Sequence, residues 1–395
     1  MKIGIYGGTF DPIHRGHITA AQAAAQQLGL DLLLLIPASI PPHKALPEGG
    51  ADAAQRLEMA TLATAELSCP AQVLDVEVRR QGKSYTADTL RTLRQQYPED
   101  ELWLLMGTDM FLSLQDWREP QEILRLVRVA AFSRTGDPEQ QRFARQKAYL
   151  EETFGAQVAV VENPHVVDIS STRLRQLLPE GREYLPEAVY GYILRQRLYG
   201  THAELKHLTP EELRPIALSF LKPKRMPHVL GTEQEAIRLA RRYGADETDA
   251  RIAALLHDCT KKLDMEQQLA LCRRYDIRLD GLEQHALKLL HAKTGAAVAR
   301  DIFGVKDAVY EAIRWHTTGK PDMTLLEKVI YLADYIEPNR DFPGVDELRR
   351  TVYDDLDKGL LMGLSDTIDE MERMGNPVHH DTLEARDFLL RGEAK

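Results

Sequence analysis

The chain has 395 residues, of which 44% are hydrophobic and 28% charged, and its net charge is −10 at neutral pH. This length predicts two domains, and the composition is that of a folded protein rather than a disordered one. The acidic charge argues against an extended nucleic-acid surface, and the apolar run 32–36 is too short to span a membrane. With three cysteines lacking CxxC spacing, the sequence predicts a cytoplasmic protein.

The first half alternates strand patterns with helix patterns. Alternation of this kind predicts an α/β domain with a parallel sheet and helical crossovers. We expect helices at residues 16–28, 54–67, 85–96, 171–178 and 186–195. The expected strands are KIGIYGG, LDLLLLIPA, AQVLDVEV, ELWLLMG, VRVAAFS and VAVVEN.

The second half loses the strand patterns and has helical periodicity in almost every segment. Thr209 and Glu212 have the spacing of a capping box and predict a helix start. The junction is expected at residues 200–207. The predicted domains are therefore 1–199, which is α/β, and 200–395, an all-α bundle.

The first strand leads into the string GGTFDPIHRGH, residues 7–17. Gly7 and Gly8 allow the backbone to turn sharply and approach a phosphate. A helix starting near Gly16 would direct its free N–H groups at the same point, where His14 and His17 add donors. Histidines in such a place can stabilise developing charge without acting as nucleophiles. The alternative is an ordinary strand, turn and helix with surface histidines.

This string is similar to the HxGH signature of nucleotidyltransferases with a Rossmann-like fold. Three later segments narrow the resemblance to bacterial nicotinate-nucleotide adenylyltransferases of NAD biosynthesis: PPHK at 41–44, SYTADTL at 84–90 and ISSTRLR at 169–175. The resemblance spans residues 1–199. It implies attack by the phosphate of nicotinate mononucleotide on the α-phosphate of ATP, with Mg²⁺ on the triphosphate and release of pyrophosphate.

The resemblance also implies roles for particular residues. His14 and His17 would hold the α- and β-phosphates, with Lys44 and Arg175 as further catalytic cations. The remaining ATP-binding residues would be Gly7, Gly8, Thr9, Phe10, Gly107, Asp109, Ser170, Ser171 and Thr172.

For the acceptor, the resemblance implies that Ser84, Tyr85 and Thr86 lie near the nicotinate carboxylate and that Trp117 stacks on the pyridine ring. Taken alone, Trp117 is better interpreted as an ordinary core aromatic, and Asp109 is equally a helix cap. Nicotinamide mononucleotide remains an alternative acceptor. Phosphopantetheine and cytidylyl chemistry are further alternatives, against which SYTADTL and PPHK argue.

Histidines and carboxylates in the second half fall on or near different expected helices. Such ligands, converging inside a bundle, make a site for one or two divalent metals. A single histidine on such a face is more often a core residue, but the number of these groups favours a metal site. The expected ligands are His228, His257, Asp258, His291, His316 and Asp334.

The order of these residues resembles the HD superfamily of metal-dependent phosphohydrolases. The segments RMPH, HDCTKK, HAKTG, HTTG and ADYIEPNR bring it closest to bacterial enzymes that split diadenosine tetraphosphate symmetrically into two ADP. The resemblance implies iron or manganese held by four inner ligands, His228, His257, Asp258 and Asp334. His291 and His316 would complete a second site or hold phosphate. Arg225, Lys261 and Arg340 would be phosphate contacts or surface charges. The alternative is a nucleotide sensor without turnover. A homo-oligomer is also possible, and His379 and His380 are expected in a peripheral, mobile tail.

Overall fold

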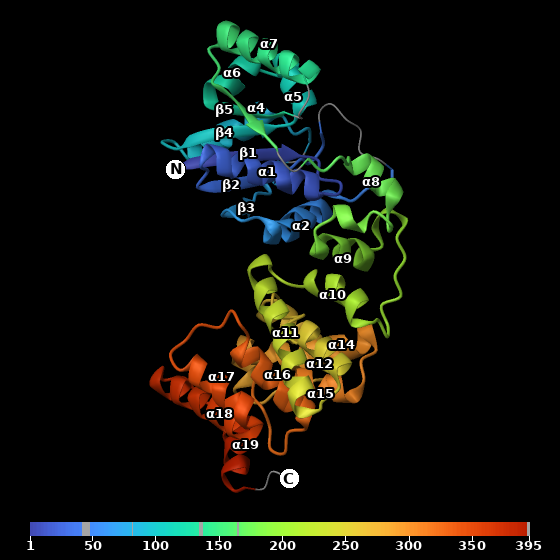
Figure 1. Ribbon diagram of the computed structural model, residues 1–395, viewed down its shortest axis with the longest axis vertical. Coiled ribbons are helices and arrows are strands. Elements are labelled where there is room, and N and C mark those ends of the chain that lie inside the picture. Colours follow the sequence, from blue (N-terminus) through green and yellow to red (C-terminus); the bar gives the residue numbers. More distant parts are fainter. Residues whose placement is uncertain (42–47, 81, 134–136, 164–165, 393–395) are drawn as a thin grey trace. The chain divides into compact units, whose positions relative to one another are not determined.

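The computed structural model describes residues 1–41, 48–80, 82–133, 137–163 and 166–392. The chain divides into two compact units, Met1–His202 and Ala203–Lys395. The first unit combines a sheet with helices, whereas the described residues of the second contain helices and no strand (Figure 1). The predicted change from α/β to all-α is therefore confirmed. None of the described helices is long and apolar enough to cross a membrane.

The first unit is built on six parallel strands in the order β3-β2-β1-β4-β5-β6. Because strand order reverses between β1 and β4, the carboxyl ends of these two strands flank the crevice where open α/β sheets bind ligands. The strands are β1 (Lys2–Gly8), β2 (Leu32–Pro37), β3 (Ala71–Val73), β4 (Glu101–Met106), β5 (Arg128–Ser133) and β6 (Val158–Glu162).

Helices cover the sheet of the first unit. Apolar side chains of α4, α6 and α7 share one core cluster with β1, β2, β4 and β5, while α1 and α2 pack on β1, β2 and β3. These helices are α1 (Arg15–Leu28), α2 (Ala53–Ala63), α3 (Val76–Arg80), α4 (Thr86–Gln96), α5 (Thr108–Leu112), α6 (Pro120–Leu126), α7 (Asp137–Phe154), α8 (Ser171–Leu177) and α9 (Glu187–Gln196).

One expected strand is mostly wrong. AQVLDVEV was predicted as a single strand, but β3 ends at Val73 and the chain turns into α3 at Val76. In α3 the side chain of Glu77 is buried and accepts a hydrogen bond from Thr89 of α4 at 2.7 Å. The alternation of apolar residues was therefore overridden by a tertiary contact, which a period-two pattern does not reveal.

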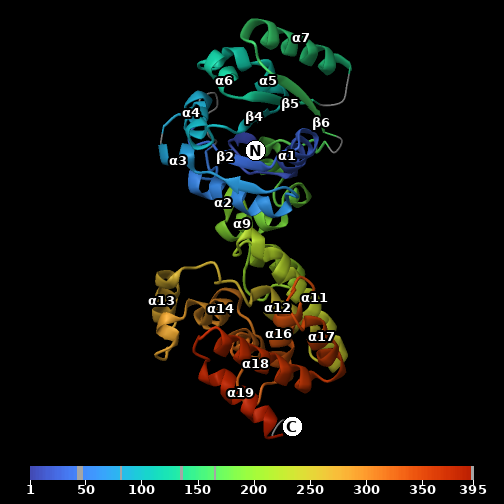
Figure 2. The same ribbon diagram turned by 90° about the vertical axis from the view of Figure 1, so that its left-hand side faces the viewer.

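The second unit is a bundle in which α11 packs on α12 and α16, and α15 packs on α12, α14 and α16. Its first helix, α10, starts with the predicted capping box between Thr209 and Glu212. Figure 2 shows α13 beside α14. The helices are α10 (Pro210–Leu218), α11 (Met226–Tyr243), α12 (Glu247–Leu256), α13 (Met265–Arg274), α14 (Leu287–Phe303), α15 (Asp307–Trp315), α16 (Leu325–Ile336), α17 (Val345–Asp354), α18 (Leu356–Arg373) and α19 (His380–Leu390).

The prediction that His379 lies in a peripheral tail is wrong. Its side chain is buried, and Nδ1 accepts the backbone N–H of Asp381 at the start of α19. Nε2 lies 3.2 Å from Asp280 and 3.5 Å from Glu283. The histidine therefore ties the last helix to the segment before α14. His380 itself is exposed.

Candidate functional site

The loop after β1 turns at Phe10 rather than at the paired glycines. β1 continues through Gly8, and Phe10 has the positive φ of 51°. A side chain at Gly8 would meet the Phe10 ring at 2.8 Å, so this glycine makes room for the aromatic ring. The predicted sharp turn is thus present, but Phe10 makes it and Gly8 permits it.

His14 and His17 lie together at the start of α1. His14 is the N-cap, and its ring centroid is 3.8 Å from that of His17. The backbone N–H of His14 donates to Nδ1 of His17 at 3.2 Å. Because Nδ1 of His17 is an acceptor, a neutral His17 carries its proton on Nε2 and is a hydrogen-bond donor there.

Both imidazoles are neutral near pH 7. Burial lowers the pKa of His14 to about 4. Burial, together with the nearby His14, lowers the pKa of His17 well below its usual value. The pair can therefore offer N–H donors and the positive end of a helix dipole to an anion, but not two full charges.

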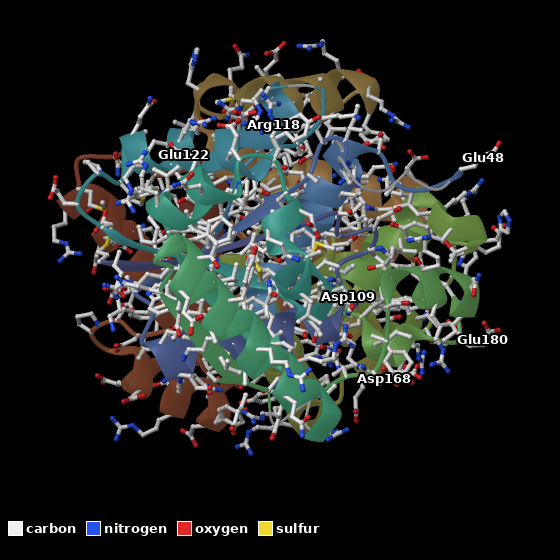
Figure 3. All side chains as sticks on the ribbon, turned by 90° about the horizontal axis from the view of Figure 1, so that it is seen from above. Glu48, Asp109, Arg118, Glu122, Asp168 and Glu180 are labelled. Atoms are coloured by element: carbon white, nitrogen blue, oxygen red, sulfur yellow. The ribbon has the colours of Figure 1, made fainter. Side chains whose placement is uncertain are left out.

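A cavity of about 630 Å³ opens on one side of this pair. The exposed Asp109 on α5, labelled in Figure 3, borders it. Its lining also contains a cation, Arg142 of α7, that the sequence did not single out. The other predicted site residues on its wall are His14, His17, Gly107, Ser170 and Ser171.

A second cavity, of about 400 Å³, lies on the other side. Four residues line both cavities: Tyr6, His17, Gly107 and Met110. Its other walls include residues that were predicted for both substrates, namely Gly7, Gly8, Thr9, Phe10, Ser84, Tyr85, Thr86 and Trp117.

The charges in the second cavity favour an anion. Arg118, labelled in Figure 3, lines it and lies with its guanidinium 4.5 Å above the ring of Tyr85. The N-terminus of α4 opens beside it, and no side chain caps that helix. Glu77 also lines this cavity and could add a negative charge, but burial raises its pKa and so disfavours the charged form. The sequence analysis did not single out Arg118, because the family resemblance assigned a role only to its neighbour Trp117.

Some predicted phosphate ligands are engaged elsewhere. Arg175 donates to the carbonyl of Asp11 at 2.6 Å and to Thr172 at 3.3 Å. Ser171 donates to the carbonyl of Pro12 at 2.9 Å. These bonds hold α8 against the loop that precedes α1. Lys44 lies outside the described residues.

The second unit brings the predicted ligands together from five helices. His228 is in the first turn of α11, His257 and His316 cap the ends of α12 and α15, and Asp334 lies in α16. Nε2 of His228 is 3.0 Å from Asp334, and Nε2 of His291 on α14 is 3.2 Å from Asp258. Among these predicted ligands, two groups could each hold an ion: His228, His257 and Asp334, and His257, Asp258 and His316.

The outer ring nitrogen of three of these histidines has a defined partner. His257, His291 and His316 each direct Nδ1 at the carbonyl oxygen three residues earlier, at 2.6, 2.7 and 2.7 Å. A carbonyl only accepts, so each Nδ1 carries the proton and each neutral Nε2 keeps a lone pair.

Where these rings are neutral, their inward nitrogens face one another with lone pairs. Although burial opposes it, Asp258 raises the pKa of His257, so a positive charge is favoured at this point of the cluster. Nε2 of His228 is 3.3 Å from Nε2 of His257, and Nε2 of His291 is 3.1 Å from that of His316. Asp258 adds a buried carboxylate oxygen with no hydrogen-bond partner among the described residues. Imidazole nitrogens and carboxylate oxygens that converge in this way form a donor set that fits divalent metal ions.

Protein cations surround the two carboxylates. Arg225 donates to Asp258, and Arg340 donates to Asp334 at 2.8 Å. Lys261 lies 2.9 Å from Nε2 of His291. All three predicted phosphate contacts therefore border the metal cluster.

Comparisons with known proteins separate the chain into the same kinds of domain. Residues 5–177 match the Cytidylyltransferase-like family, and residues 225–339 match the HD domain. A protein of Gloeobacter violaceus named "Probable nicotinate-nucleotide adenylyltransferase" is 43% identical over 209 residues, which are 51% of this chain and 98% of the relative.

The second half has relatives of its own. A symmetrical bis(5'-nucleosyl)-tetraphosphatase of Halalkalibacterium halodurans is 42% identical over 183 residues, 44% of this chain and 95% of the relative. A crystal structure from Clostridium acetobutylicum, described as a predicted HD superfamily hydrolase involved in NAD metabolism, is 41% identical with a TM-score of 0.46, over 47% of this chain and 98% of that one. The chain therefore belongs to the cytidylyltransferase-like family, as a relative of nicotinate-nucleotide adenylyltransferases, through its first half and to the HD hydrolases through its second.

Proposed function

We propose that the first half, residues 1–199, transfers the adenylyl group of ATP to nicotinate mononucleotide, giving deamido-NAD and pyrophosphate. The observation that carries this proposal is the pair of cavities that share His17 and Gly107. ATP would occupy the larger cavity and the acceptor the smaller one. Two ligands bound in this way meet at a single point, as an in-line displacement requires.

The residues at the shared wall account for the chemistry. The acceptor phosphate oxygen attacks the α-phosphorus of ATP, and the bond from that phosphorus to the bridging oxygen of pyrophosphate breaks. Nε2 of His17 and the free N–H groups of α1 donate to the oxygens on which charge develops. Mg²⁺ bound with ATP would supply further neutralisation, and no covalent enzyme intermediate is needed.

The acceptor assay tests this proposal directly. The full chain with Mg²⁺ and ATP is incubated with nicotinate mononucleotide, nicotinamide mononucleotide or phosphopantetheine, and pyrophosphate release is followed. We expect the fastest release with nicotinate mononucleotide. Equal or faster release with nicotinamide mononucleotide would show that the proposed acceptor is wrong. Release only with phosphopantetheine would show that the proposed reaction is wrong.

We further propose that the second half, residues 200–395, hydrolyses diadenosine tetraphosphate to two ADP. Symmetrical cleavage places a water oxygen on one of the two central phosphorus atoms and expels ADP. Divalent ions would supply Lewis acidity and a more acidic water, held by His228, His257, Asp258, His291, His316 and Asp334. Arg225, Arg340 and Lys261 border the carboxylates, where they can bind the phosphate oxygens of the substrate.

Product analysis distinguishes this hydrolase from a sensor. Chromatography of a reaction with diadenosine tetraphosphate should show ADP as the sole product, with metal in the purified chain. A chain that binds the compound without releasing ADP would be a sensor. AMP together with ATP would mean asymmetric cleavage and would contradict the proposed position of attack.

A further inference from the structure

His228 differs from the other three histidines of the metal cluster in the group that holds it. Its Nδ1 contacts Oε1 of Glu337 at 3.0 Å, whereas the other three contact backbone carbonyls. Glu337 follows the last residue of α16 and has only 1% of its surface exposed. A buried carboxylate behind a ligating imidazole fixes the tautomer and makes the imidazole a stronger donor.

The surroundings of Glu337 fix which oxygen faces the histidine. Its other oxygen, Oε2, accepts both the backbone N–H and the side-chain N–H of Asn339, at 2.7 and 2.9 Å. Gly231 on α11 provides the space, because a side chain there would lie 2.2 Å from Oε2. The carboxylate is therefore clamped between two donors on one side and one imidazole N–H on the other.

We propose that Glu337 is a positioning residue that holds His228 with its proton on Nδ1 and thereby sets the metal affinity of the cluster. This inference rests on the proposed metal-dependent function. The carboxylate does not face the cluster itself. It acts through His228, whose Nε2 must keep its lone pair to bind an ion.

The substitution Glu337→Gln separates this role from packing. An amide of almost the same shape has one acceptor and one donor face. If its oxygen satisfies the two donors of Asn339, its NH₂ faces Nδ1 of His228. The imidazole then has to accept there and carry its proton on Nε2, where it blocks metal binding.

The substitution Glu337→Ala distinguishes a positioning role of Glu337 from a packing role, because the two roles predict opposite orders of metal affinity for the variants. Alanine removes the acceptor behind Nδ1 of His228 without placing a donor there, and Asn339 is exposed enough for water to reach it. We therefore expect metal affinity to fall in the order wild type, Glu337→Ala, Glu337→Gln. A packing role predicts the reverse order for the two variants, because glutamine fills the space and alanine does not.

The measurement is the affinity of the full-length, metal-free chain for Mn²⁺, by competition with a chelating dye. Loss of support behind a ligating histidine typically costs about 10- to 100-fold in affinity, and we expect this for Glu337→Gln. Glu235→Gln is the matched control. Glu235 is a buried glutamate of the same bundle that binds Tyr353 at 2.7 Å, away from the ligands.

Each result has one meaning. Unchanged Mn²⁺ affinity in Glu337→Gln, or a greater loss in Glu337→Ala, overturns the inference while the metal site stands. Wild-type chain without affinity for Mn²⁺, Fe²⁺ or Co²⁺ overturns the proposed function itself. An equal loss of Mn²⁺ affinity in Glu235→Gln would show that removing any buried charge from the bundle weakens metal binding. That result would also overturn the specific role of Glu337.

Discussion

Replacing His17 by alanine should slow adenylyl transfer strongly while leaving the fold intact. The ring is only half-buried and forms part of the wall between the two cavities. Its Nδ1 accepts the N–H of His14, so its Nε2–H is the group that can reach a phosphoryl oxygen. Loss of one such preorganised donor typically costs about 10²- to 10³-fold in kcat.

The low pKa of His17 narrows the expected loss in kcat. Because its pKa lies well below the usual value, the donor is neutral at pH 7, and neutral donors bind anions less strongly than charged ones. We therefore expect the lower end, a fall of about 100-fold in kcat, which is about 2.7 kcal/mol in the barrier. The KM for ATP should change much less, because the rest of the cavity remains.

Stopped assays of pyrophosphate release at saturating ATP and nicotinate mononucleotide measure this effect. Thermal unfolding of the variant checks the fold. A variant within threefold of the wild-type kcat would refute the reasoning, since the donor shared by both cavities would then play no part in the transition state. A fall in kcat with a parallel rise in the KM for ATP would assign His17 to ground-state binding instead.

Three further predictions concern charge, protonation and metal. Arg118→Gln should lower the preference for nicotinate over nicotinamide mononucleotide about tenfold, because a charge-assisted contact to the carboxylate is lost. The control Arg125→Gln lies outside the acceptor cavity and should leave the preference unchanged. Equal losses of activity with both acceptors in Arg118→Gln would contradict the proposed contact. In histidine-labelled protein, the His14 imidazole should stay neutral from about pH 8 down to about pH 5.5 and titrate near 4, because burial lowers its pKa; a midpoint near 6.5 would contradict the burial argument. A chain stripped with a chelator and returned to Mg²⁺ alone should keep adenylyl transfer and lose tetraphosphate hydrolysis until Mn²⁺ or Fe²⁺ is added. Hydrolysis that survives with Mg²⁺ alone would contradict the requirement for Mn²⁺ or Fe²⁺.

Features that depend on nearby residues could be predicted from the sequence. The capping box of Thr209 and Glu212 forms as expected, because its hydrogen bonds join residues three apart. The parallel sheet follows from the alternation of strand and helix patterns, and the order of ligands along the second half indicated a cluster. The strand expected to continue beyond Val73 failed because Glu77 contacts Thr89 on another helix.

Features that depend on the approach of distant segments could not be predicted. The contact between His228 and Glu337 joins residues 109 positions apart and requires Gly231 to leave space. The sequence contains all three residues but does not reveal that they are in contact in the folded structure. The same holds for His379, whose buried place beside Glu283 depends on how α19 packs, so its position near the end of the chain was misleading.

The two sites use neutral histidine in opposite tautomers, and this can be measured. In the first half a donor is needed, and Nδ1 of His17 accepts a backbone N–H, which leaves the proton on Nε2. In the second half a lone pair is needed, and the carbonyls behind His257, His291 and His316 keep the proton on Nδ1. Long-range ¹H–¹⁵N spectra of the metal-free chain near pH 8 should therefore show an Nε2–H form for His17. They should show Nδ1–H forms for His291 and His316, whose pKa values burial lowers. An Nδ1–H signal for His17 would remove the donor from the proposed transfer step, and Nε2–H forms in the second half would remove the lone pairs on which metal binding depends.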